Sequence, residues 1–188
     1  SAASDVYKRQ PQQRLLLELG YASLHAIGQR RATLRGSDGG VFLGIMNADF
    51  ASLTSDSGSV YAATGGTISI AAGRLSFSLG TQGPCVSIDT ACSSALVATQ
   101  HAALCVRSPP PYRECASALV LAVSLMLSPR THETYARAGM LSADGRCKTF
   151  DKRANGYVRG EGVGSFVLLG HDAFPINRRP SPNVQRMK

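Results

Sequence analysis

The sequence lacks tryptophan and long apolar runs, and its composition is otherwise that of a globular domain. The longest apolar run, residues 116–127, is interrupted by serines and is too short to cross a bilayer as a helix. Apolar residues make up 44% of the 188 residues, which is enough for a buried core. We therefore expect one soluble domain, or a large piece of a longer one, in the cytoplasm, with a plastid location left open.

The five cysteines include no C-x-x-C pair, and their number is odd. No secretory signal sequence precedes them. These features favour free thiols in a reducing compartment over a disulfide framework. The four histidines are scattered without the spacing of metal ligands, so no metal site is predicted. No nucleotide or flavin motif is present either.

Acidic residues are scarce, and the formal net charge is +8. The excess lies at the two ends, because residues 1–14 carry +2, residues 171–188 carry +3, and the long stretch between them carries only +3. A nucleic-acid-binding domain would concentrate basic residues along one face of its body. The distribution therefore argues against nucleic acid as a partner and is compatible with an acidic protein partner.

Hydrophobic periodicity separates a folded region from two unpatterned ends. Residues 1–10 are polar, and we interpret them as an unstructured tail or a sequence-end artefact. Residues 171–188 contain three prolines and no periodicity, so we expect a disordered end there. One folded region, residues 11–170, lies between them.

Helices and strands alternate along this region. The predicted elements are helices over 11–28, 67–79, 91–106 and 129–138, and strands over 41–46, 84–89, 116–127 and 163–169. The segments 30–40, 49–61 and 139–159 are predicted to be loops or connections. Apolar strands separated by helices are typical of α/β folds with a mostly parallel sheet that helices cover on both faces.

Residues 83–98, GPCVSIDTACSSALVA, carry the strongest indication of chemistry. A predicted strand leads through small residues into a predicted helix, and Cys92 lies at the turn between them. Unpaired backbone N–H groups and the positive end of the helix dipole favour the nucleophilic thiolate at such a position. The same amides could bind an oxyanion. Cys92 is therefore the candidate nucleophile.

Other roles for the cysteines stay open from the residues alone. A buried cysteine is more often a small packing residue than a nucleophile. Cys85, Cys105 and Cys115 lie in apolar runs and are predicted to be packing residues. An α/β-hydrolase elbow is disfavoured, because it would need glycine where Thr90 and Ser94 stand.

Residues 89–94, DTACSS, resemble the active-site signature of β-ketoacyl synthases (ketosynthases), which belong to the thiolase-like superfamily. The resemblance continues in register over residues 11–169. It includes PQQRLLLE at 11–18, YAATGGTISIAAGRLSFSLGTQGP at 61–84 and GMLSADGRCKTFDKRANGYVRGEGVG at 139–164. These ordered motifs are similar to those of type I polyketide or fatty-acid synthases rather than to those of thiolases.

The resemblance implies an incomplete thiolase-like fold, part of the N-terminal half of a ketosynthase, over residues 11–170. It also implies decarboxylative Claisen condensation, in which Cys92 accepts an acyl chain and a malonyl-type extender loses carbon dioxide and attacks it. The implied partner is an acyl carrier protein, whose phosphopantetheine arm is the only cofactor; none is expected to be bound by this chain itself. The complete domain is implied to be a homodimer, with residues 85–88 near the two-fold interface.

Two further residues follow from the resemblance, which places Thr67 and Tyr135 near the acyl pocket. Ordinary roles, in a helix for Thr67 and in packing for Tyr135, stay open. A group of charged loop residues is implied to form a structural ion-pair network: Asp144, Arg146, Asp151, Arg159 and Glu161.

The sequence also departs from the family. The family's first strand and its second half, with two catalytic histidines, are expected but absent, and no histidine present follows a matching motif. Two other functions therefore stay open: a non-catalytic segment that assembles with a partner chain, and a thiolase-type acyltransferase. The loop at 139–164 argues against the thiolase alternative.

Overall fold

The computed structural model describes residues 10–46, 49–54, 67–109 and 111–170. The predicted disordered end at 171–188 and almost all of the predicted tail lie outside these ranges. The described elements are α2 (Pro11–Ala26), α3 (Arg31–Leu34), β1 (Gly40–Ile45), α4 (Asp49–Thr54), α6 (Ser69–Leu79), β2 (Cys85–Ile88), α7 (Ser94–Arg107), β3 (Ser117–Ser124), α8 (Pro129–Arg137) and β4 (Gly162–Leu169).

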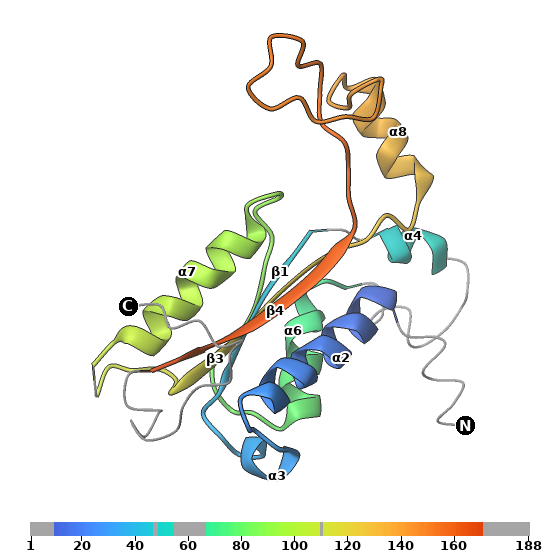
Figure 1. Cartoon of the computed structure of the whole chain (residues 1–188). Coiled ribbons are helices and arrows are strands. Elements are labelled where there is room, and N and C mark those ends of the chain that lie inside the picture. The colour runs from blue at the N-terminus through green and yellow to red at the C-terminus, as the bar shows by residue number, and fades with distance from the viewer. Residues whose placement is uncertain (1–9, 47–48, 55–66, 110, 171–188) are drawn as a thin grey trace.

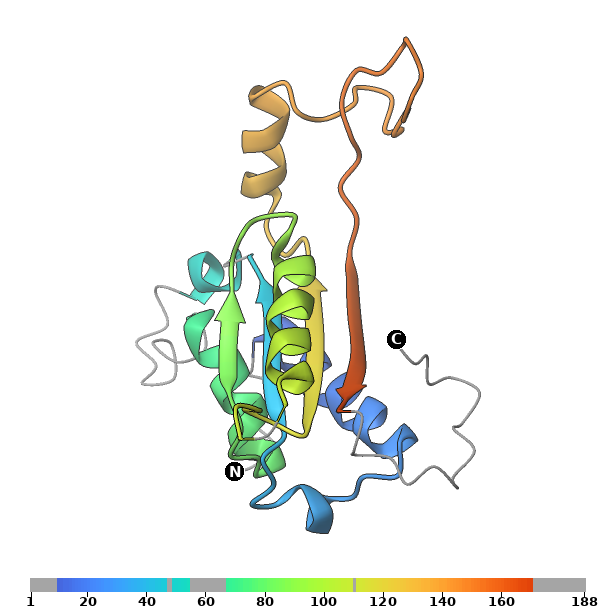
Figure 2. The same ribbon diagram turned by 90° about the vertical axis from the view of Figure 1, so that its left-hand side faces the viewer.

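The four described strands form one mixed sheet in the order β2-β1-β3-β4. β1 pairs in parallel with both β2 and β3, and β4 pairs antiparallel with β3. Helices α2 and α6 cover one face of the sheet and α7 covers the other (Figures 1 and 2). The predicted α/β architecture, mostly parallel and covered on both faces, is confirmed.

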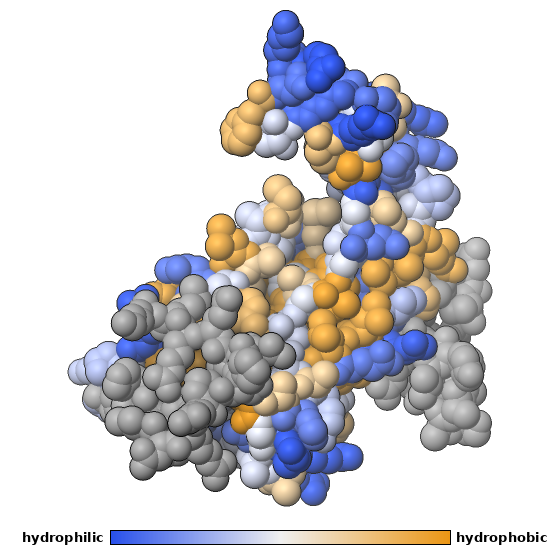
Figure 3. Space-filling view, in the orientation of Figure 1, coloured by the Kyte–Doolittle hydropathy of each residue, from blue (hydrophilic) through white to orange (hydrophobic). Residues whose placement is uncertain are grey.

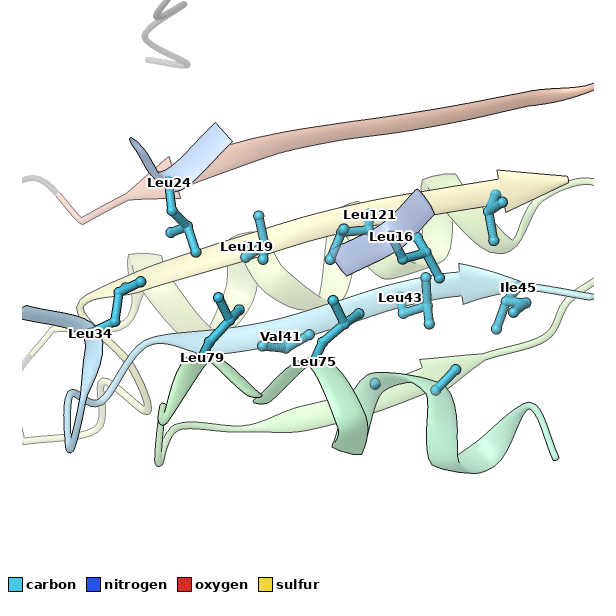
Figure 4. Close-up of a cluster of buried hydrophobic side chains, with 13 residues drawn as sticks. Leu16, Leu24, Leu34, Val41, Leu43, Ile45, Leu75, Leu79, Leu119 and Leu121 are labelled. Atoms are coloured by element: carbon cyan, nitrogen blue, oxygen red, sulfur yellow. The ribbon is translucent and has the colours of Figure 1, made fainter. Parts of the chain in front are cut away.

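β1 is the centre of the fold, and every residue of it is buried. Successive side chains of a strand point to opposite faces. Val41 and Leu43 therefore pack with Leu16 in the cluster under α2 and α6 (Figure 4). Phe42 points the other way and packs with Ala98 of α7 in a second cluster. These two clusters fix the sheet between its helical layers, mainly by burying apolar surface.

β2 is an edge strand, and this position overturns one prediction. The sequence predicts a buried strand with Cys85 as a packing residue, but Cys85 is exposed. The apolar run alone does not show that β2 has a partner on only one side among the described strands. The packing prediction is confirmed for Cys105 and Cys115, which are both buried.

Local signals set the ends of the long helices. Pro11 occupies the first turn of α2, where its missing N–H costs nothing. Gln10 belongs to the fold rather than to the predicted tail: it is 3% exposed, and its side chain accepts a hydrogen bond from the Gln13 N–H at 2.8 Å. α6 ends at Gly80, whose φ of 78° lies in the left-handed region that glycine adopts without strain.

Two short helices lie where the sequence predicts loops. α3 falls within the predicted loop 30–40, and its Leu34, 4% exposed, reaches the core. α4 falls within the predicted connection 49–61, whose last residues lie outside the described ranges. Helices this short have too few residues to display a hydrophobic period, so the pattern does not reveal them.

We use the name arm for residues 129–161, which comprise α8 and the irregular segment after it. The arm projects away from the sheet and is mostly hydrophilic (Figures 1 and 3). Its two sides are tied together, because the Ser142 N–H donates to the Tyr157 carbonyl at 2.9 Å and the Tyr157 N–H donates to the Met140 carbonyl at 3.1 Å. The predicted short helix and the long irregular segment are thus both confirmed.

Candidate active site

The carboxyl ends of β1, β2 and β3 meet at one edge of the sheet, because the three strands are parallel. Ligand sites of open α/β sheets form at such an edge. The segment after β2, residues 89–94, lies there and is called the elbow. The arm starts from the same edge, so elbow and arm lie on the same end of the molecule (Figures 1 and 2).

Hydrogen bonds between residues of the elbow stabilise its turn. Oδ1 of Asp89 accepts the Ala91 N–H at 3.0 Å, which allows the backbone to turn immediately after β2. The Ser94 hydroxyl accepts the Thr90 N–H at 2.9 Å and donates to the Ala91 carbonyl at 2.7 Å. Ala91 takes a φ of 57°, a conformation that is strained for a residue with a side chain.

One backbone N–H group of the elbow donates no hydrogen bond within the described residues. The N–H groups of Ser93 and Ser94 donate to the Thr90 and Ala91 carbonyls, and those of Thr90 and Ala91 are paired as above. The N–H of Cys92 has no acceptor among the described residues. An amide without an acceptor in this part of the chain, beside an exposed thiol, can donate a hydrogen bond to an oxygen that develops negative charge near the sulfur.

Cys92 lies two residues ahead of α7, which begins at Ser94 rather than at the predicted residue 91. The difference arises because the elbow turns through the left-handed conformation of Ala91 before the helix starts. The positive end of the α7 dipole still faces this turn, and this favours negative charge at its amides. The predicted arrangement of strand, cysteine and helix is therefore present.

Thr67 and Tyr135 belong to different segments of the chain, one just ahead of α6 and the other on α8. Thr67 is exposed and precedes α6, and its carbonyl accepts the Ile70 N–H at 3.3 Å. Tyr135 lies on α8, where the guanidinium of Arg159 stacks 5.2 Å from the centre of its ring. That contact is a cation–π interaction within the arm. The acyl-pocket role of both residues stays a prediction.

Two of the five charged residues predicted to form one network form ion pairs, and in the described structure both pair with residues outside that set. Lys148 donates to Asp144 at 2.7 Å, and together with the Ser142 hydroxyl it lowers the pKa of Asp144 to about 2. Arg153 binds Asp151 through two nitrogens and lowers the pKa of that carboxyl. Two local pairs, each with a partner from outside the predicted set, replace the single predicted network.

Glu161 has a different function from the pairs in the arm. Its Oε1 accepts the Met126 N–H at 2.7 Å. This bond joins the last residue of the arm to the segment that follows β3. The sequence gives no signal for this contact, because the two residues lie 35 positions apart.

No cluster of three or more potential metal ligands occurs within the described ranges. His25, His101 and His132 lie on α2, α7 and α8. The ring of His101 packs edge-on against Phe42, with 5.4 Å between the ring centres.

The two hydrogen bonds of the Ser94 hydroxyl are not predicted from the sequence. The signal for them is weak, since a serine in the first turn of a helix is an ordinary capping residue.

Comparison with known proteins identifies the family. A family model described as "Beta-ketoacyl synthase, N-terminal domain" matches residues 2–173. A phenolphthiocerol/phthiocerol polyketide synthase from Mycobacterium tuberculosis is 45% identical over 163 residues, which are 84% of this chain and 7% of that protein. A highly reducing polyketide synthase from Calcarisporium arbuscula is 41% identical over 89% of this chain and 7% of its own length.

Comparison with solved structures indicates the same family. The ketosynthase from module 6 of the bacillaene synthase of Bacillus subtilis 168 has a TM-score of 0.74 and 40% identity, covering 85% of this chain and 26% of that chain. An oxazolomycin ketosynthase domain of Streptomyces albus has a TM-score of 0.77 and 29% identity, covering 89% and 30%. This chain thus spans less than a tenth of the curated relatives and under a third of the solved ketosynthases. The chain belongs to the β-ketoacyl synthase family and corresponds to part of the N-terminal domain of the ketosynthases of type I polyketide synthases.

Proposed function

We propose that Cys92 is the acyl-accepting nucleophile of a ketosynthase that works in polyketide or fatty-acid synthesis. One observation carries the proposal: an exposed thiol lies beside the single N–H group of the elbow that is left without an acceptor among the described residues. A thiolate and an oxyanion donor are what acyl transfer to cysteine requires. Membership of the ketosynthase family supports this interpretation of the pair.

In the proposed step the thiolate of Cys92 attacks the carbonyl carbon of an acyl thioester. A carbon–sulfur bond forms, and the carbonyl oxygen becomes an oxyanion that the Cys92 N–H stabilises. The bond to the leaving sulfur then breaks, and the released thiolate takes up a proton. The acyl group is now a thioester of Cys92.

The acyl thioester would come from an acyl carrier protein through its phosphopantetheine arm. The elbow lies at an edge of the sheet, and Ala91, Cys92 and Ser93 are all exposed, so an extended thioester arm has access to the sulfur. We also propose that the complete ketosynthase is a homodimer with β2 near its two-fold axis. The exposed edge of β2 supports this, since edge strands tend to pair with further strands. In the described part of the chain no helix is long and apolar enough to span a membrane.

Condensation requires more hydrogen-bond donors than acylation does. A malonyl-type extender must lose carbon dioxide, and the resulting enolate needs donors to stabilise its charge. None of the three histidines within the described ranges has a hydrogen bond or ring contact with the elbow. Each preorganised donor that is missing costs about 10²- to 10³-fold in rate. We therefore propose that this chain by itself accepts an acyl group but does not form the carbon–carbon bond.

The test is to incubate the chain with an acyl thioester and a malonyl carrier protein and to analyse all species by mass spectrometry. We expect an acyl adduct that maps to Cys92 and no β-ketoacyl product. The adduct should vanish in Cys92→Ala and persist in Cys147→Ala, which removes another exposed thiol. An adduct that survives Cys92→Ala would disprove the assignment, and multiple turnovers of β-keto product would disprove the limit to acylation.

A further inference from the structure

Gly44 lies directly beneath the first turn of α7. It is the penultimate residue of β1 and pairs with Ile88 on one side and Ala122 on the other. A Cβ atom at this position would lie 2.7 Å from the backbone nitrogen of Ala95 and 2.7 Å from the carbonyl carbon of Ser94. Both are backbone atoms, so they cannot rotate away as a side chain would. The absence of a side chain therefore sets how closely α7 approaches the sheet.

Ser94 continues this contact into the elbow. It is 5% exposed, and its hydroxyl bonds the Thr90 N–H on one side and the Ala91 carbonyl on the other. The two bonds span the turn in which Cys92 lies, and they hold Ala91 in its left-handed conformation. The first of these bonds also occupies the Thr90 N–H.

We infer that Gly44 and Ser94 are positioning residues, which together fix the direction and height of the Cys92 N–H above the edge of the sheet. The inference rests on the proposed acyl transfer at Cys92. Gly44 sets the position of the first turn of α7, and Ser94 fixes the elbow to that turn. Neither residue needs to touch the substrate, because both act through the backbone.

Two reactions of the same thiol separate this positioning from a merely structural role. Acylation by a thioester builds an oxyanion and depends on the direction of the Cys92 N–H. Alkylation by iodoacetamide displaces iodide and builds no oxyanion, so it depends only on the thiolate and its accessibility. The ratio of the two rate constants at Cys92 therefore reports the oxyanion donor and cancels effects on the thiol itself.

The variants come with matched controls. Ser94→Ala removes two bonds that span the elbow, while Thr99→Ala removes a hydroxyl further along α7, outside the elbow, that donates to the Ala95 carbonyl at 2.8 Å. Gly44→Ala places a Cβ against the backbone of α7, while Gly73→Ala places one where nothing lies within 4 Å. For Ser94→Ala and Gly44→Ala we expect acylation of Cys92 to fall about 10- to 100-fold and alkylation to change by less than about threefold. Both controls should keep the wild-type ratio.

The experiment distinguishes a failure of the proposed function from a failure of the positioning inference alone. If the wild-type chain is not acylated, the proposed function fails and the inference fails with it. If the wild type is acylated but Ser94→Ala keeps the wild-type ratio, the inference alone is overturned. Equal losses in Ser94→Ala and Thr99→Ala would also overturn it. Alkylation of the buried Cys105 would reveal that Gly44→Ala does not fold. In that case Ser94→Ala alone tests the inference.

Discussion

Asp49 and Thr131 are joined across 82 residues of sequence: the Thr131 hydroxyl donates to Oδ1 of Asp49 at 2.7 Å. The other carboxylate oxygen accepts the N–H groups of Leu127 and Ser128, each at 3.2 Å. Asp49 is 7% exposed, so these bonds form largely out of water. One carboxylate at the start of α4 thus holds the junction between β3 and the arm.

Replacing Asp49 with alanine should loosen the base of the arm. Three donors lose their acceptor, and two of them are backbone N–H groups just ahead of α8. Buried hydrogen bonds to a charged group contribute about 1.5–3 kcal/mol each, without being additive, so we expect a loss of about 2–3 kcal/mol. Urea unfolding measures the global effect, and hydrogen exchange at Leu127 and Ser128 measures the local one.

Glu133→Gln is the control for this variant. Glu133 also lies near the base of the arm, but it forms an exposed ion pair with Arg137 at 3.9 Å. Such a pair contributes less than about 0.5 kcal/mol. Unchanged exchange at Ser128 in Asp49→Ala would show that the carboxylate does not anchor the arm.

The buried thiol of Cys115 should make stability depend on pH in the alkaline range. Burial, with a further contribution from Cys105, raises the pKa of Cys115 from 9.0 to about 11. Because the folded pKa lies above the unfolded one, the stabilisation is fully present below about pH 9 and is lost as pH rises towards 11. The loss reaches at most about 3 kcal/mol, since one pKa unit corresponds to about 1.4 kcal/mol.

The comparison of wild type with Cys115→Ala isolates this effect from tyrosines and lysines that also titrate at high pH. The free energy of unfolding, from urea denaturation at a series of pH values, should fall more steeply above pH 9 in the wild type than in the variant. Parallel curves would mean that the thiol does not titrate differently in the folded state.

Truncation of two neighbouring residues on α6 should have very different effects on stability. Leu75 is 1% exposed and packs against the sheet, whereas Phe77 is 90% exposed. Leu75→Ala should cost about 2–5 kcal/mol, because it removes buried methyl groups and leaves a cavity. Phe77→Ala should change stability by less than about 0.5 kcal/mol in the isolated chain. Thermal or urea unfolding tests the pair, and a large loss in Phe77→Ala would mean that α6 is packed differently.

Much of this fold follows from the sequence because its signals are local. The apolar runs that form β1 and β3 and the small residues of α7 indicate a parallel sheet between helical layers, and the DTACSS motif places Cys92 at a turn before a helix. Contacts over long sequence separations are different. No local pattern shows that β2 is an edge strand with Cys85 exposed, or that Asp49 caps the junction with α8.

The elbow shows the same limit at the scale of the site. Cys92 can be identified from its motif, but whether its amide lacks an acceptor among the described residues depends on which neighbouring N–H and carbonyl groups pair with one another. That depends on the φ of Ala91, on the hydroxyl of Ser94 and on the close approach of Gly44 from a strand far away in sequence. These are properties of the folded backbone, and residue types alone do not give them.

The five cysteines should react with iodoacetamide in an order that their surroundings set. Cys92 is exposed beside the positive end of α7, so it should react first. Cys147 is exposed, but its sulfur accepts the Val158 N–H at 3.2 Å, which occupies the sulfur and should slow its attack. Cys85 should be slower again: the residue as a whole is exposed, but its sulfur is partly shielded from water, which raises its pKa and lowers the thiolate fraction.

Cys105 and Cys115 complete the order. Both are buried and both have raised pKa values, so they should stay unlabelled until the chain unfolds. Quantitative peptide mapping by mass spectrometry over a time course gives all five rates, and labelling in urea gives the unfolded reference. Labelling of Cys105 and Cys115 at the rate of Cys92 would mean that the isolated chain is not folded. Labelling of Cys147 with Cys92 untouched would instead contradict the site itself, because the elbow would then hide the sulfur that it is proposed to present.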